Sequence, residues 1–70
     1  MSFALEKLRK QRNQTLAEVA QAVGCDAAHL SRVERGIFRP SPKLAERLAK
    51  HFGYAITEIE ILYPERFADN

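Results

Sequence analysis

Two short runs of apolar residues between positions 15 and 36 constrain the fold more than any other feature of the chain. In the first run, Leu16, Val19 and Val23 are spaced three and four residues apart, so in a helix they share one face. In the second run, Leu30 and Val33 repeat this spacing. The pattern therefore predicts two short amphipathic helices.

The residues at and before the join predict how these helices meet. Gly24 lies between them, where a sharp turn uses the tolerance of glycine for positive φ. Ala20 is small enough for the backbone of a steeply crossing helix to approach closely. Such a pair, with a tight turn between its members, is typical of a helix-turn-helix.

The outward side of the second helix indicates its function. A helical wheel places Ala28, Ser31, Arg32 and Arg35 opposite the apolar side. This side carries neither the large apolar groups of a protein-binding groove nor the carboxylates of a metal site. Small residues allow close approach to a flat surface, and the planar fork of Arg32 fits O6 and N7 of guanine in a major groove. We interpret this segment as a DNA recognition helix.

With these residues the chain resembles the Cro and lambda-repressor type of helix-turn-helix domain, the XRE family. The resemblance covers residues 3 to 62. It implies an all-α, five-helix lambda-repressor-like domain, a stand-alone regulator whose partner is double-stranded DNA. The matching residues are Thr15, Glu18, Ala20, Gly24, Leu30, Ser31, Val33, Glu34, Gly36, Pro40 and the run from Leu48 to Gly53.

Length and composition limit the alternatives. Seventy residues suit a single domain spanning 1–70 and leave no room for a catalytic cleft, so an enzyme is not expected. The single Cys25 excludes an internal disulfide and suits a reduced compartment. We find no membrane-spanning run and no signal peptide, and expect a bacterial cytoplasmic protein associated with the nucleoid through DNA.

Charge is unevenly distributed along the chain. Residues 1–50 hold ten lysines and arginines against five acids, whereas residues 51–70 hold one arginine against four acids. A basic body suits a polyanionic partner, and the acidic end suits a different role. An ordinary solvated surface would explain the same distribution.

The remaining helices are expected at residues 3–12, from the N-cap Ser41 and Pro42 to about Phe52, and at 56–62. The last segment partly alternates between apolar and polar residues, as a strand would. The resemblance favours a helix there. Thr15 and Glu18 form a capping box for the helix that follows them, and Asp26 is expected to cap the recognition helix.

Four residues of the recognition helix are predicted to face bases. His29 could instead pack sideways against a neighbouring helix, because it lies on the flank of the wheel. The predicted base contacts are Ala27, Ala28, His29 and Arg32.

Six residues are predicted to contact the DNA backbone. Relatives of this type commonly have a phosphate-binding glutamine where this chain has Leu16, which offers only its backbone amide, so this contact should be weaker. Arg39 could alternatively be a solvated surface arginine. The predicted backbone contacts are Thr15, Leu16, Ser31, Arg35, Arg39 and Lys43.

A structural ion pair is also implied by the resemblance. An arginine at the position of Arg9 pairs with a glutamate at the position of Glu34 in similar proteins, which would orient the recognition helix. The alternative is that both side chains are solvated.

The C-terminal segment carries more apolar surface than a small domain buries by itself, which predicts self-association. Residues 55–70 are therefore assigned to dimerisation, although the tail could instead fold back on its own domain. The predicted interface residues are Ile59, Leu62, Tyr63 and Phe67.

These expectations combine into a repressor that binds a palindromic operator as a homodimer, as in phage and plasmid regulators. Activation through RNA polymerase, using Glu18 or other acids, is one alternative, and an antitoxin or other protein-binding module is another. No cofactor is expected. Cys25 and His29 are four residues apart, but two ligands do not make a metal site.

Overall fold

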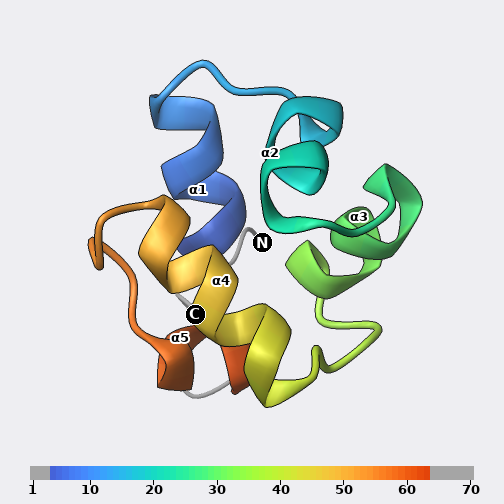
Figure 1. The fold of residues 1–70 in the computed structure, drawn as a ribbon, viewed down its shortest axis with the longest axis vertical. Coiled ribbons are helices and arrows are strands. Elements are labelled where there is room, and N and C mark those ends of the chain that lie inside the picture. The colour runs from blue at the N-terminus through green and yellow to red at the C-terminus, as the bar shows by residue number, and fades with distance from the viewer. Residues whose placement is uncertain (1–3, 64–70) are drawn as a thin grey trace.

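The computed structural model describes residues 4–63, which form five helices and no strand, as the all-α prediction requires. The first three helices are similar in length, the fourth is the longest, and the fifth is little more than one turn (Figure 1). Their bounds are α1 Ala4–Gln11, α2 Leu16–Val23, α3 Ala27–Glu34, α4 Pro42–His51 and α5 Glu58–Leu62.

Local signals placed the central helices correctly. Thr15 Oγ1 accepts from the Glu18 amide at 3.1 Å, and Glu18 Oε1 accepts from the Thr15 amide at 2.8 Å, so the predicted capping box is confirmed. Gly24 has φ of 80° and reverses the chain between α2 and α3. Ser41 caps α4 by accepting from the Leu44 amide at 3.2 Å.

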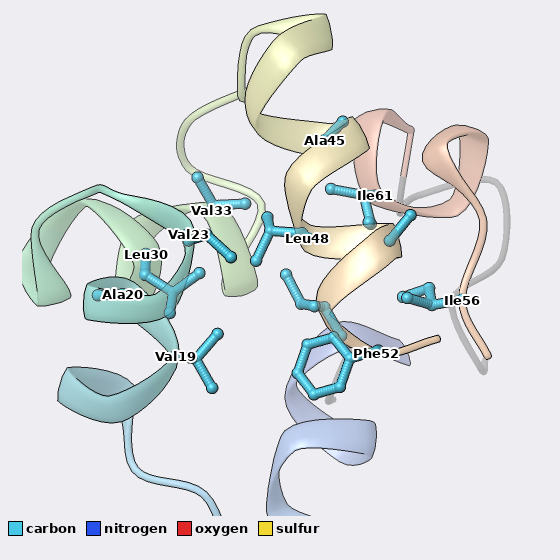
Figure 2. Close-up of a cluster of buried hydrophobic side chains, with 12 residues drawn as sticks. Val19, Ala20, Val23, Leu30, Val33, Ala45, Leu48, Phe52, Ile56 and Ile61 are labelled. Atoms are coloured by element: carbon cyan, nitrogen blue, oxygen red, sulfur yellow. The ribbon is translucent and has the colours of Figure 1, made fainter. Parts of the chain in front are cut away.

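The core is formed where α2 and α3 meet α4 (Figure 2). Leu30 of α3 and Leu48 of α4 are completely buried, and Phe52 at the end of α4 is 1% exposed. Ala20 is buried at the crossing of α2 and α3, as its size predicted. The fourth helix also packs on α5, so this one helix contacts both α2 and the last helix of the domain.

The last helix differs from its prediction in its start. It begins at Glu58 rather than at residue 56, because Thr57 forms a second capping box with Glu60. Ile56 therefore lies before the helix, and its side chain is buried in the core. The strand alternative for this segment is excluded.

The apolar surplus predicted at this end is smaller than expected. Ile56 and Ile61 are both 2% exposed, so the domain buries them itself. Leu62 packs partly against the same core, and Ile59, at 54% exposure, is the only apolar residue of α5 that is exposed. Tyr63, also predicted for the interface, is partly buried. Phe67, the fourth predicted interface residue, lies outside the described residues.

Between residues 4 and 63, no helix has both the length and the apolar character that crossing a membrane would require.

Candidate nucleic-acid interface

The third helix has one buried and one open side. Leu30 and Val33 are at most 2% exposed and anchor α3 to the core. On the opposite side, Ala28, Arg32 and Arg35 are exposed. The helix lies at the edge of the domain (Figure 1), so this basic side is accessible to a partner.

The four predicted base-contact residues differ in accessibility. Ala28 and Arg32 are exposed, whereas Ala27 is partly buried and packs against the core. His29 is also partly buried, and its ring centroid lies 5.7 Å from that of Phe38. The sideways packing considered for His29 is therefore present, but its partner is a loop residue rather than a helix.

Sequence reasoning missed the role of Phe38 beside the recognition residues. Its ring is 49% exposed, and the guanidinium carbon of Arg32 lies 5.8 Å from the ring centroid. The local signal was Gly36, whose φ of 76° turns the chain back after α3. The contacts themselves depend on loop geometry that spacing along a helix does not reveal.

The N-terminus of α3 departs from expectation in one detail. Asp26 occupies the N-cap position with an extended backbone, as predicted, but its side chain makes no capping hydrogen bond. Its negative charge still lies near the positive end of the helix dipole.

The N-terminus of α2 has backbone amides that an anion could bind. The capping box uses the amides of Thr15 and Glu18, whereas those of Leu16 and Ala17, as first-turn amides, have no acceptor within the helix. The Leu16 side chain packs against the core, so its amide is what this residue offers a phosphate. Hydrogen bonds from the Thr15 backbone and hydroxyl lower the pKa of Glu18.

The other predicted backbone contacts lie on α3, α4 and the loop between them. Ser31 is partly buried, whereas Arg35 and Lys43 are exposed, and Arg35 Nε donates to the Ser31 carbonyl at 3.4 Å. Arg39 is exposed, and its guanidinium carbon lies 4.7 Å from the Tyr63 ring centroid. This stacking joins the loop after α3 to the end of α5.

The expected partners Arg9 and Glu34 are in contact and buried. Arg9 Nε donates to Glu34 Oε2 at 2.7 Å, and Nη2 donates to Oε1 at 3.1 Å. Arg9 Nη1 also donates to the Gln14 carbonyl at 2.9 Å. The hydrogen bond to Glu34 raises the pKa of Arg9, and the pair ties α1 to the end of α3.

Comparison with known proteins agrees with this geometry. A family model described as helix-turn-helix, of the Cro/C1 type, matches residues 5–59. The chain belongs to this helix-turn-helix family. Proteins of the family are DNA-binding transcription regulators, and this membership supports DNA as a partner of the chain. Searches of curated proteins and of solved structures gave no significant match.

In this helix-turn-helix domain, a groove of about 740 Å³ runs beside the recognition helix, and Cys25, Asp26, His29 and Arg32 are among the residues that line it. Burial, and secondarily the charge of Asp26, raise the pKa of the Cys25 thiol, which keeps it protonated at neutral pH. Among residues 4–63, no three histidine, cysteine or acidic side chains are grouped as metal ligands would be.

Proposed function

We propose that this protein is a repressor that binds a palindromic operator as a homodimer. The observation that carries the proposal is the open side of α3, on which Ala28 and Arg32 are exposed one turn apart while the opposite side is buried. An exposed methyl group and a guanidinium at this spacing suit adjacent base edges in a major groove. We assign base recognition chiefly to Arg32 and Ala28.

Contacts to phosphates would fix the position of the domain on the duplex. The amide of Leu16 lies at the start of α2, the side chain of Lys43 in the first turn of α4, and the side chain of Arg35 at the end of α3. Cations and first-turn amides at separate points fix orientation without carrying sequence information.

The dimer follows from how little one domain can recognise. A single recognition helix covers about four or five base pairs, and pairing two domains on half-sites one helical turn apart doubles the site. The last helix lies on the other side of the domain from α3 (Figure 1), and its Ile59 is 54% exposed. Contact through α5 would therefore leave both recognition helices open.

Repression requires only that the dimer occupy a promoter and exclude polymerase. The helix-turn-helix match covers residues 5–59, most of the part of the chain that the structure describes. Occupying a promoter is the simplest way in which such a domain can regulate transcription.

The test is selection of bound fragments from a random double-stranded DNA pool, followed by gel-shift titration of the selected site at two salt concentrations. We expect an inverted repeat with half-site centres about one turn apart and affinity that falls steeply with salt. Repression is then measured from a promoter that carries the site. Selection of an asymmetric short site would contradict the dimer, and retention of no DNA would contradict the proposed function.

A further inference from the structure

The loop that carries Phe38 is fixed at both of its ends, next to Arg32 and at Pro40. The backbone amides of Ile37 and Phe38 both donate to the Arg32 carbonyl, at 2.9 and 3.3 Å. Gly36, with φ of 76°, makes the reversal that permits these bonds. Two residues beyond Phe38, Pro40 is buried and anchors the far end of the loop.

The ring of Phe38 lies beside two of the predicted base-contact side chains. Its centroid is 5.8 Å from the guanidinium carbon of Arg32 and 5.7 Å from the imidazole centroid of His29, with the two rings tilted by 43°. An arginine near an aromatic ring at this distance is attracted by the ring quadrupole. Because Phe38 is 49% exposed, burial in the core does not explain its position.

We propose that Phe38 is a positioning residue for DNA recognition, which holds the Arg32 guanidinium in place before a base pair is met. The inference rests on the proposed function and deepens it. An exposed arginine samples many rotamers. It loses that freedom when two of its N–H groups donate to guanine. If the Phe38 ring already restricts those rotamers, the Arg32 side chain loses less conformational entropy when it binds guanine. Contacts of other residues with phosphates are unaffected.

This role predicts a specific pattern among variants of the loop. Phe38→Leu keeps apolar bulk but removes the π face, and should lower the preference for guanine at the Arg32 position about two- to fivefold. Phe38→Tyr keeps the face and should retain the preference. Ile37→Ala is the matched control, since Ile37 lies in the same loop and is 63% exposed. Competition gel shifts on the selected site and its single-base variants measure the preference.

Two readouts separate positioning from a general structural effect. The affinity for random DNA and its salt slope should be the same for wild type and Phe38→Leu, and circular dichroism melting checks that the variant is folded. In an Arg32→Ala background, Phe38→Leu should cause no further loss of base preference. A loss that persists without Arg32, or one that falls equally on every sequence, would overturn the inference.

A direct contact of the ring with DNA is tested by replacing thymines of the half-site with deoxyuridine, which removes only the C5 methyl group. If Phe38 acts through Arg32, the ratio of wild-type to Phe38→Leu affinity is unchanged by this replacement. A ratio that falls to one would instead make Phe38 a base-contacting residue and overturn the positioning role. If the wild type shows no sequence preference, the proposed function fails as well; if it does and Phe38→Leu matches it, only this inference fails.

Discussion

Arg32 and Arg35 are both exposed near the C-terminal end of α3, yet their surroundings differ, and we propose different roles for them. The Arg32 guanidinium lies by the Phe38 ring, whereas Arg35 folds along its own helix and donates to the Ser31 carbonyl. A side chain held at the open side suits base recognition. A side chain that lies along its own helix, as that of Arg35 does, suits contact with the phosphates.

Replacing each arginine separately should distinguish these roles. Arg32→Ala should cost about 1–3 kcal/mol at one base position and little elsewhere. Arg35→Ala, the matched control, should weaken binding to all sequences and reduce the salt slope by about 1. Gel shifts on the selected site and its single-base variants measure both. Equal losses on every sequence for Arg32→Ala would contradict its role.

The carboxylate of Glu18 gives stability a dependence on pH. Hydrogen bonds in the folded state lower its pKa from the ordinary value of 4.5, so its contribution is present above that value and lost as pH falls through the folded pKa. Glu18→Gln keeps a reciprocal capping bond but cannot titrate. The stability advantage of wild type over Glu18→Gln should therefore shrink from about pH 7 to about pH 3 in thermal melts. Parallel curves would show that the carboxylate is not involved.

At this scale, the sequence predicts residues whose partners are close in the chain. The capping box of Thr15 with Glu18 follows from their spacing in the sequence. The turn at Gly24 follows from the tolerance of glycine for positive φ. The contact of Phe38 with Arg32 and that of Arg39 with Tyr63 are set by how a loop folds over a helix or meets a distant one. Spacing carries no information about such contacts.

Between elements, the buried pair of Arg9 and Glu34 fixes α3 relative to α1. Three hydrogen bonds from one guanidinium satisfy both carboxylate oxygens and the carbonyl of Gln14, which ends the connection from α1. The side chains of Arg9 and Glu34 are only 10% and 4% exposed, so little water is available to replace a lost partner. The pair therefore specifies the orientation of the recognition helix.

Breaking this pair should be costly, and removing both charges much less so. Arg9→Met leaves the Glu34 carboxylate buried without its partner and should lower the free energy of unfolding by about 3 kcal/mol or more. Arg9→Met with Glu34→Leu removes both charges and should recover most of that loss. Urea unfolding at neutral pH measures both variants. If the double variant is as unstable as the single one, packing rather than charge explains the loss.

The fifth helix shows where prediction of an element fails. Its helical type was predicted from the resemblance, but its start depended on whether Thr57 caps or Ile56 joins the helix. The deciding feature is the capping box of Thr57 with Glu60, a local signal that the sequence analysis did not use. Burial in the core, a tertiary effect, removed Ile56 and Ile61 from the apolar surface expected for pairing.

In the whole molecule, recognition and pairing are assigned to opposite sides. The open side of α3 lies at one edge, and α5 with exposed Ile59 lies at another (Figure 1). Contact through α5, as we propose, would therefore not cover the open side of α3.

Ile59 is the residue with which to test pairing. Ile59→Ala should weaken self-association about fivefold or more, equivalent to about 1 kcal/mol, without lowering thermal stability of the domain. Ile37→Ala is the matched control, because Ile37 is similarly exposed but follows α3. Sedimentation velocity over a concentration series measures the association. An unchanged dimer would place the interface elsewhere.

Four of the chain reversals are made by residues in the left-handed region: Asn13, Gly24, Gly36 and Gly53, with φ between 55° and 80°. Each lies just after a helix, so the change of direction is encoded within the few residues where it occurs. Because these turns are set by residues close in the sequence, few contacts between residues far apart in the sequence have to form before the helices pack. We therefore expect it to fold on the order of microseconds to milliseconds, fast enough for newly made copies to reach their site without delay.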